Sequence, residues 1–311
     1  MTYTVRDAQL DDTRAIMALH TARIGVWQRL DVDARVETVP YESLTVHQRW
    51  LHGGAWMSIE TAAIWLNHLL LGGGMPLVVA RDGDPIAYAE VYAGSEPDPY
   101  GLHLYLGEVV TPDEEAIPAL LDALAVRAKQ HKVRHVLIAR TGDEMVRAVE
   151  ARARPRPIAC LRRFTLSARQ GQVFYRAVES PDADPKRIAG WSMPVGRYTS
   201  ARAQWESLWS HLWDTLPDTK THRRHRLQLS AGGQEALVCV QQAMYDPRAA
   251  EVFVWAPKLL TSQVVASLRD WGHREGYRTL TFAVEEDGAS ILGAEAEGDG
   301  FRQETCALVL T

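Results

Sequence analysis

Apolar and polar residues alternate in two adjacent runs near residue 83, and this alternation is the clearest pattern in the first half of the chain. The runs MPLVVA (75–80) and PIAYAEVYAG (85–94) flank a turn at Gly83, which predicts a β-hairpin. Before the hairpin the same criteria predict a strand and two helical stretches, at 3–8, 11–27 and 45–74. After it the apolar spacing switches between strand and helix periods. This predicts a strand, a helix, a strand, a helix and a closing strand, at 101–110, 112–131, 135–140, 143–153 and 158–168.

The second half repeats this order of elements. We predict a helix, a hairpin, a strand–helix–strand unit, a short helix and a closing strand, at 202–216, 225–244, 250–257, 262–276, 279–286, 289–297 and 305–311. The hairpin glycines Gly83 and Gly233 lie 150 residues apart, and Pro112 and Pro257, which follow the central strands, lie 145 apart. Similar offsets for separate landmarks indicate a duplicated domain.

The repeat divides the chain into two domains of similar design. We expect an N-terminal domain at 1–167 and a C-terminal domain at 195–311. Between them, 168–194 contains ESPDADPKRIAG, a cluster of Pro, Asp and Gly that is typical of a linker.

Composition and charge narrow the class of protein. The 311 residues are 46% hydrophobic and 23% charged, as in globular proteins, and the net charge of −5 argues against a general nucleic-acid binder. No apolar run reaches the roughly 18 residues of a membrane span, and the first residues lack a signal-peptide pattern. We therefore expect a cytoplasmic protein with no membrane contact. Cys160, Cys239 and Cys306 lie far apart in apolar runs, so reduced core cysteines are expected, and no metal-ligand spacing such as HExxH occurs.

Three local patterns accompany this order of elements: YTVRDAQLDDTRAIMAL at the start, VVTPDEEAIPALLDAL in the middle and GDGFRQE near the end. Together with the order of elements, they make the chain resemble the GNAT (GCN5-related N-acetyltransferase) superfamily, in tandem. The resemblance implies an α/β (α+β) fold of two GNAT-like domains, each a mixed, mostly antiparallel twisted sheet flanked by helices. It also implies acetyl-CoA as cofactor, an acyl-CoA-dependent N-acyltransferase activity, and a small-molecule or protein amine as acceptor.

In this superfamily a bulged strand before the central helix binds the pantetheine arm. The loop that follows, Arg/Gln-x-x-Gly-x-Gly/Ala, holds the pyrophosphate with its amides, since the positive end of a helix attracts anions. In the first half this loop is about three residues short. Thr111 and Glu114 fit a capping box there, and the acids at 113–115 would stabilise the helix and repel a pyrophosphate. We therefore do not expect acetyl-CoA to bind the first half in the usual way.

The second half keeps the family length at this loop, in PKLLTSQVVASL. Thr261 and Ser262 could cap the helix or donate to a phosphate, and a plain N-cap is the alternative we favour. If either half binds CoA, the resemblance places it here. The residues expected to contact it come from the strand and the helix start: Val254, Trp255, Ala256, Thr261, Ser262 and Gln263.

Two glutamates are candidates for the base that deprotonates the amine. Glu108 and Glu251 lie four and six residues before the prolines that end the central strands, so strand period two gives them the same face relative to that landmark. Two ordinary surface glutamates are the alternative. The tyrosine that often serves as general acid is missing, since Ala296 stands at its position in the second half.

Two other features stand out. The basic run Lys220 to Arg226 could meet an anionic acceptor, RNA or a CoA phosphate, or could be a solvated loop; the basic segment Arg152 to Arg163 is open to the same alternatives. Trp205, Trp209 and Trp213 form one stripe of a predicted helix, which is typical of a core or a domain interface. The apolar Trp-rich region at 45–74 could pack between the halves or form a homodimer surface.

Two functions of different classes remain open. The chain is either an acyltransferase that uses its second domain, with Glu251 or Glu108 as base, or a GNAT-fold protein without catalysis that acts as a binding or assembly module. The family's usual activity favours the first function. The missing glycines and tyrosine favour the second.

Overall fold

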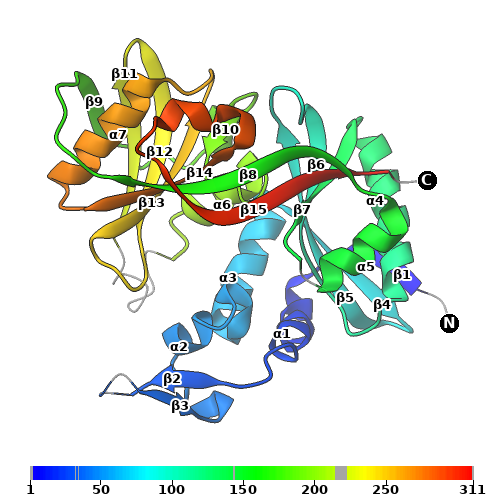
Figure 1. Ribbon diagram of the computed structural model, residues 1–311. Coiled ribbons are helices and arrows are strands. Elements are labelled where there is room, and N and C mark those ends of the chain that lie inside the picture. The colour runs from blue at the N-terminus through cyan, green and yellow to red at the C-terminus, as the bar shows by residue number, and fades with distance from the viewer. Residues whose placement is uncertain (1–2, 32, 34, 143, 214–222, 310–311) are drawn as a thin grey trace.

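A computed structural model describes residues 3–31, 33, 35–142, 144–213 and 223–309 (Figure 1). The elements of the first half, in chain order, are β1 (Tyr3–Asp7), α1 (Thr13–Thr21), β2 (Gln28–Leu30), β3 (Val36–Thr38), α2 (Val46–Trp50), α3 (Ile59–His68), β4 (Met75–Arg81), β5 (Asp84–Ser95), β6 (Leu102–Val110), α4 (Ala116–Gln130), β7 (His135–Arg140), α5 (Glu144–Ala153) and β8 (Arg156–Ser167). Those of the second half are β9 (Tyr175–Glu179), β10 (Ser192–Val195), α6 (Ala201–Leu208), β11 (Arg224–Ala231), β12 (Gln234–Gln242), β13 (Ala249–Ala256), α7 (Ser262–Arg274), β14 (Thr279–Glu285) and β15 (Glu297–Leu308).

One continuous sheet runs through both halves of the described chain. Its strand order is β1-β4-β5-β6-β7-β15-β8-β14-β13-β12-β11-β9, and β10 pairs with β13 beside this path. Only the pairs β6–β7 and β13–β14 are parallel among the described strands. Each parallel pair is joined by one helix, α4 or α7, because parallel neighbours need a crossover connection. The fold is therefore mixed α/β with a mostly antiparallel sheet, as expected.

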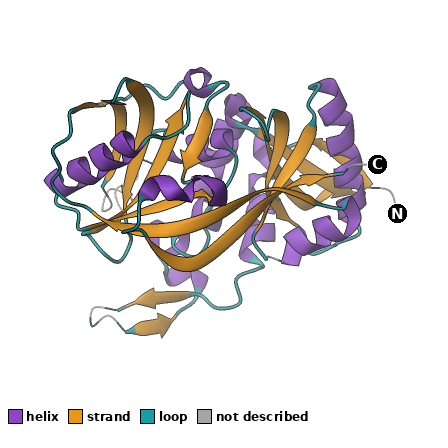
Figure 2. Cartoon of the chain, turned by 45° about the horizontal axis from the view of Figure 1, so that its top comes forward, coloured by secondary structure: helices purple, strands orange, loops and turns teal. Residues whose placement is uncertain are grey.

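The two closing strands join the halves. β15, which ends the chain, pairs with β7 of the first half from Glu304–Arg140 to Leu308–Val136. β8, which ends the first half, pairs with β14 of the second half. The two strands also pair with each other and cross the middle of the molecule together, as Figures 1 and 2 show. Neither half therefore has a sheet made only of its own strands.

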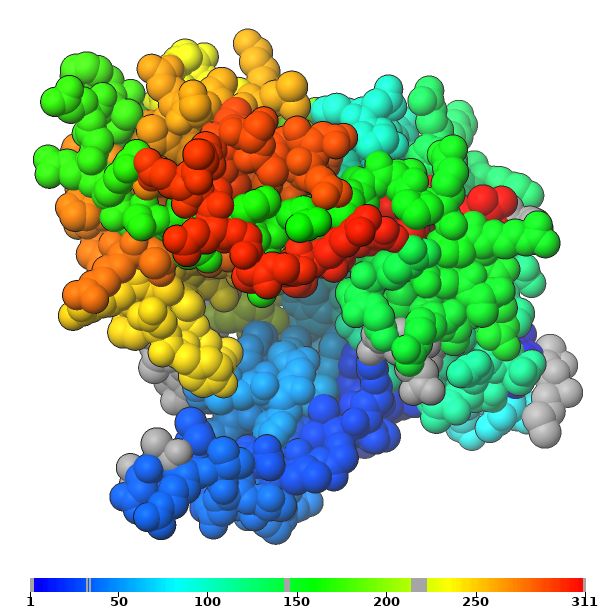
Figure 3. All heavy atoms as spheres, in the orientation of Figure 1, coloured from blue at the N-terminus to red at the C-terminus, as the bar shows by residue number. Residues whose placement is uncertain are grey.

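Helices cover both faces of the sheet in each half. In the first half α4 and α5 pack over one apolar cluster, which includes Leu106 and Ile138, and α1 and α3 pack over another, which includes Tyr88 and Tyr105. In the second half α7 covers one face and α6 the other. Figure 3 shows the segment with α1, α2 and the β2–β3 hairpin projecting from the body of the molecule.

Several local expectations differ from the structure. The segment 168–194 contains β9 and β10, which both pair with strands of the second half; the domain boundaries themselves stay a prediction. α4 begins at Ala116 rather than at Pro112, so the acids of 113–115 lie in the loop before it and the capping box of Thr111 and Glu114 is not formed. α6 ends at Leu208, and Trp213 lies beyond the helix. Segment 45–74 is broken into short helices.

Candidate active site

The strand before α4 is bulged and then leaves its parallel neighbour. β6 pairs with β5 at Glu108–Glu90 and next at Leu106–Val91, so Gly107 is the extra residue of a β-bulge. On the other edge, the ladder between β6 and β7 ends at Leu106–Ile138, although β6 continues to Val110. β15 pairs with the opposite edge of β7, along Val136–Arg140, so it does not fill the edge of β7 that β6 leaves. The bulge and the parting strands leave room between β6 and β7.

A cavity of about 490 Å³ occupies this room. Its walls include Gly107, Glu108 and Val109 of β6 and Ile138 and Ala139 of β7. The cavity is also lined from one face of the sheet by Val146 and Val149 of α5. From the other face it is lined by His20 of α1 and by Arg23 and Ile24, which follow that helix. It therefore passes through the sheet between the two strands. We call it the slot.

Glu108 lines the slot. A residue that exchanges a proton with a reactant in the slot would have to lie there. Its carboxylate lies 3.5 Å from the Arg23 guanidinium, and both side chains are about two-fifths exposed, at 40% and 43%. Because Glu108 lies opposite Glu90 in the antiparallel ladder, both side chains point to the α1 face. Glu90 lies behind the slot wall, where sequence patterns gave no sign of it.

Glu90 is a buried carboxylate with a complete set of donors. It accepts hydrogen bonds from the indole nitrogens of Trp56 (2.8 Å) and Trp65 (2.9 Å) and from the hydroxyls of Tyr92 (2.6 Å) and Tyr88 (3.3 Å). Charged groups are buried only when such donors satisfy them. This network fixes Trp56, whose ring lines the slot.

The loop before α4 satisfies its own amides. Thr111 Oγ1 accepts from the Asp113 amide (3.0 Å), and Asp113 Oδ1 accepts from the Glu115 amide (3.1 Å). The next two amides, of Ala116 and Ile117, donate to the carbonyl groups of residues 113 and 114. Asp113 itself binds Arg81 (2.9 Å) and the hydroxyl of Tyr3 (3.1 Å). Four of the amides that could hold a pyrophosphate at this helix, those of residues 113 and 115–117, are therefore already bonded.

In the second half the corresponding space is filled by the chain itself. The β13–β14 ladder ends at Val252–Phe282, and beyond it β10 pairs with β13 at Val195–Val254 and Ser192–Ala256. Gly196, which follows β10, donates its amide to the carbonyl of Ala283 on β14 (2.7 Å).

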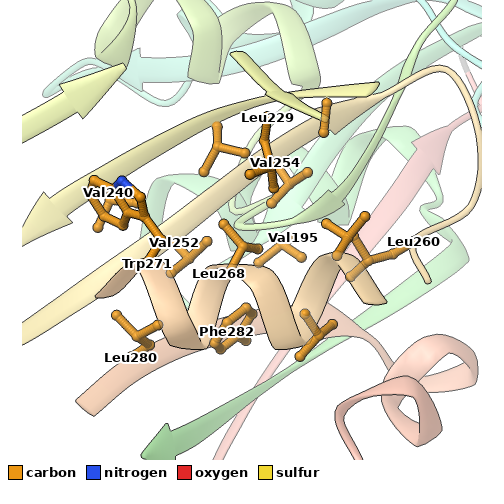
Figure 4. Packing of buried hydrophobic residues seen from close by; sticks show 14 of the residues in the cluster. Val195, Leu229, Val240, Val252, Val254, Leu260, Leu268, Trp271, Leu280 and Phe282 are labelled. Atoms are coloured by element: carbon orange, nitrogen blue, oxygen red, sulfur yellow. The ribbon is translucent and has the colours of Figure 1, made fainter. Parts of the chain in front are cut away.

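β10 is packed as a core element. Val195 is fully buried among the side chains under α7, as Figure 4 shows. Gly196 has a φ of +80°, and a Cβ there would lie 2.3 Å from the ring of Phe253, so this close turn requires glycine. The space between the strands at Val254 and Ala256 is therefore occupied by protein.

The start of α7 is an ordinary capped helix. The Thr261 hydroxyl accepts from the Val264 amide at 3.4 Å, which confirms the N-cap alternative. Ser262 is the first helical residue, and Gln263 lies over the hairpin turn at Gly232. Trp255 is fully buried on the α6 face, and its indole donates to the carbonyl of Ala201 (3.0 Å).

Glu251 lies near the second half's own surface groove. It lines a pocket of about 460 Å³ with Arg163 and Asp299, and it accepts a short hydrogen bond from the Tyr198 hydroxyl. Burial raises the pKa of Glu251, and the hydrogen bond from Tyr198 and the charge of Arg163 oppose this rise. The Tyr198 side chain also lines the slot of the first half, so one tyrosine of the second half lies between the two cavities.

The structure therefore separates the two candidate bases. Glu108 lies in the slot, and Glu251 lies beside a different pocket; they are linked through Tyr198. Tyr198 and His20 are slot residues that the sequence patterns missed. The run SMPVG, at the end of the predicted linker, is the one local sign of the strand β10. No nearby residue indicates which strand it pairs with.

The basic run is partly structural. Arg226 is buried and donates to the carbonyls of Leu208 (2.9 Å) and Ser210 (2.9 Å), beyond the end of α6. Arg224 binds Gln241 (3.0 Å). These arginines satisfy the open carbonyls at a helix C-terminus. Lys220, Thr221 and His222 lie outside the described residues.

The tryptophans of the predicted helix occupy both of the places expected for them, the core and the contact between the halves. Trp205 and Trp209 stack at 4.4 Å in the core under α6. Trp213 packs against Trp50 (4.5 Å) and Trp65 (6.1 Å) of the first half. This part of the Trp-rich region thus joins the halves.

The described residues contain neither a cluster of metal ligands nor a membrane-spanning helix. No group of three His, Cys, Asp or Glu side chains there could hold a metal ion. No helix among them is long and apolar enough to cross a membrane.

Comparisons with known proteins give matches at the level of structure alone. No protein-family model and no curated protein matches the chain. A GCN5-related N-acetyltransferase from Anabaena variabilis covers 100% of the chain with 73% of its own length, at 12% identity and a TM-score of 0.63. A probable N-acyltransferase from Enterococcus faecalis covers 100% with 73% of its length, at 13% identity and a TM-score of 0.56. A GCN5-related N-acetyltransferase from Kribbella flavida covers 98% with 70% of its length, at 12% identity and a TM-score of 0.56.

At such low sequence identity these structural similarities establish the fold alone. The activity has to be argued from the residues of the site. The similarities extend over both halves, which agrees with the repeat in the sequence. The chain therefore has the fold of the GCN5-related N-acetyltransferases, arranged in tandem.

Proposed function

We propose that the chain is an N-acyltransferase whose acyl group and acceptor amine meet in the slot of the first half. The observation that carries this proposal is the parting of β6 and β7 beyond the Gly107 bulge, with a cavity that opens to both faces of the sheet. Two reactants that enter such a cavity from opposite sides can meet between the strands, which supplies the proximity that transfer needs. Glu108 is placed there to accept the proton that the amine loses.

Acetyl-CoA, the donor that this fold implies, fits the site only in part. The slot and the free edge of β6 suit a thioester and its pantetheine arm. The start of α4 does not suit the pyrophosphate, because the amides of residues 113 and 115–117 are already bonded and Asp113, Glu114 and Glu115 surround them. We therefore assign no role in the reaction to the α4 amides. A CoA-type donor would have to place its phosphates elsewhere. The cations beside that loop already pair with its acids: Arg152 lies 3.7 and 3.8 Å from Glu114 and Glu115, and Arg81 lies 2.9 Å from Asp113.

The second half remains the competing location. The predicted contacts at Val254, Trp255, Ala256, Thr261, Ser262 and Gln263, with Glu251 as base, stay a prediction. The pairing of β10 with β13 works against it, since an arm bound there would first have to displace four residues of strand.

The two locations can be separated by calorimetric titration with acetyl-CoA. Val146→Trp fills the α5 end of the slot, and Thr261→Glu places an acid at the start of α7. We expect Val146→Trp to weaken binding at least tenfold and Thr261→Glu to leave it unchanged. Val126→Trp, on an exposed position of α4, is the matched control for the added ring. The reverse pattern would move the site to the second half.

Glu108→Gln then tests the chemistry. We expect donor binding to persist and the rate of thiol release with an amine to fall by roughly 10²-fold or more, as when a general base is removed. Equal rates in both proteins would remove Glu108 from the reaction.

A non-catalytic binding protein is the second candidate. It is favoured by the occupied amides at α4 and by the strand in the second half. Absence of any binding or thermal stabilisation at millimolar acetyl-CoA, CoA or longer acyl-CoA would leave this candidate and reject the first. A cytoplasmic location and a homodimer stay predictions in either case.

A further inference from the structure

His20 is a buried polar side chain at the slot that the proposed reaction does not use. It lies on α1, is 6% exposed and lines the slot. Its Nε2 has no hydrogen-bond partner among the described residues. A buried nitrogen without a partner costs free energy, and such groups in folded proteins call for an explanation.

The ring is held in one orientation by its neighbours. It stacks on Trp56 at 5.3 Å with an interplanar angle of 7°, and it meets Tyr88 edge-on at 5.9 Å. Trp56 and Tyr88 are themselves fixed by their hydrogen bonds to Glu90. His20 is therefore prearranged at the slot wall, as a ligand-contacting group would be.

The α1 end of the slot has no net charge and includes an apolar wall. Ile24, Met57 and Trp56 line it. Arg23 and Glu108 are the charged side chains that line it, and they lie 3.5 Å apart. The other titratable groups in the lining are His20, His52, Tyr105 and Tyr198; His52 bonds Gln28, and Tyr198 bonds Glu251. A protonated amine would lose water here, and the Glu108 carboxylate that could offset this loss is already paired with Arg23.

The His20 environment agrees with this description. Burial, and to a smaller extent the charge of Arg23, lowers the pKa of His20 to about 3. The imidazole is therefore neutral across the physiological range. An ammonium group at the same place would meet the same two effects.

We propose that the α1 end of the slot is the acceptor subsite for a neutral aromatic amine, whose N–H donates to His20 Nε2. The flat ring lies against the apolar wall of Ile24, Met57 and Trp56, which suits an aromatic body with one polar end. His20 is a positioning residue in this arrangement, and Glu108 takes the proton. The inference rests on the proposed function, since it names the substrate class of the same site.

The test is an equilibrium titration of the whole chain with two probes of similar size, observed by ligand NMR at pH 7. Aniline is neutral at this pH and benzylamine is a cation. We expect aniline to bind the unaltered protein at least tenfold more tightly than benzylamine. We also expect the ring nitrogen resonances of ¹⁵N-labelled His20 to shift with aniline, assigned by their loss in the variant.

His20→Phe keeps the ring stack and removes the nitrogen, so aniline binding should weaken at least tenfold. His20→Gln, which can still offer a polar group, should recover part of that loss. His103→Gln is the control: His103 is also buried, and its Nε2 also lacks a hydrogen bond among the described residues, although the Glu96 carboxylate lies 3.6 Å away; it lies outside the slot. Thermal melting of each variant shows that it is folded.

Three results would overturn the subsite: equal aniline binding in His20→Phe and the unaltered protein, benzylamine binding as tight as aniline, or no probe binding at millimolar concentration. Acyl transfer is measured separately, with acetyl-CoA and aniline. Binding that depends on His20 without transfer would refute the proposed function and leave the subsite standing. Transfer with equal rates to both amines, and no effect of His20→Phe, would refute the subsite and leave the proposed function standing.

Discussion

The two halves of the chain share a plan and differ in what lies between their parallel strands. In each half a parallel pair stops early, at Leu106–Ile138 in the first and Val252–Phe282 in the second. In the first half the space beyond is the slot. In the second half it is β10, a strand of four residues that adds Val195 to the core. A short segment from outside the repeat thus decides which half has room for a ligand.

The starts of the helices that follow these strands also differ, and here it is the second half that keeps the family's loop length. At α4 the amides of the preceding loop donate to Thr111 and to the carboxylate of Asp113, and Glu114 and Glu115 add two more negative charges beside them. At α7 the loop keeps the family length and carries a single hydroxyl cap. The first half therefore has a cavity between its parallel strands but lacks the usual phosphate site at α4. The second half has an ordinary capped helix at α7 but no cavity between its strands. Duplicated domains can lose different parts of one ancestral site.

Buried tryptophans show a third difference. In the first half the indoles of Trp56 and Trp65 donate to the carboxylate of Glu90. In the second half the indoles of Trp205 and Trp209 donate to main-chain carbonyls (2.9 and 2.8 Å). The hydrogen bonds of the first half depend on one side chain, so a single substitution removes their acceptor. Those of the second half have main-chain acceptors, which a substitution does not remove.

Glu90→Leu should have the largest effect on stability. It removes the acceptor of two indoles and two hydroxyls and leaves these donors buried, so we expect a loss of about 3–5 kcal/mol in the free energy of unfolding. Urea denaturation at pH 7 measures it. Glu90→Gln keeps one carbonyl oxygen and should lose less. A loss below about 1 kcal/mol for Glu90→Leu would mean that the network does not hold the slot wall.

His20 should make the first half sensitive to acid. Its pKa is lowered to about 3 in the folded protein against 6.5 unfolded, so below pH 6.5 the unfolded chain binds a proton that the folded chain does not. The free energy of unfolding therefore falls with falling pH, by up to about 1.4 kcal/mol per pH unit between pH 6.5 and 3. The His20→Phe variant should lack this contribution. Exposed His131→Phe is the control, and identical slopes for all three proteins would contradict the expectation.

Thr261→Ala should destabilise the second half slightly. It removes the hydroxyl that caps α7, at a cost of about 0.5–1 kcal/mol, toward the low end because the bond is long at 3.4 Å. Ser262→Ala, one residue on and exposed, should change nothing. Thermal melting of the pair decides this, and an equal loss in both would show that the cap contributes nothing.

The smallest effect is expected at Glu251. Burial raises its pKa in the folded protein, so the folded chain keeps a proton that the unfolded chain has lost. The free energy of unfolding therefore falls as pH rises from the model-compound value of 4.5 through the folded pKa. Glu251→Gln should flatten this part of the profile, and Glu108→Gln serves as the comparison. A steeper profile in Glu251→Gln would contradict the assignment.

The sequence determined the order of elements and the existence of a repeat. Alternation around Gly83 and Gly233 and the helical spacing after Pro112 and Pro257 are local signals, because each depends on residues a few positions apart. The same patterns placed Glu108 on the strand that lines the slot. They also gave the N-cap at Thr261 correctly.

The tertiary structure decided where the open site lies and what completes it. A four-residue strand such as Ser192–Val195 has no period long enough to reveal its partner, and pairing between distant strands depends on the whole sheet. The same holds for β15, whose alternation fixes its faces but not its neighbours β7 and β8. His20 and Tyr198 carry no motif, and they line the slot only because α1 and the loop after β10 meet there. Glu90 of β5 carries none either, and it lies behind the slot wall, where it binds Trp56. Local sequence sets local conformation, and the site arises from contacts between segments that local patterns do not encode.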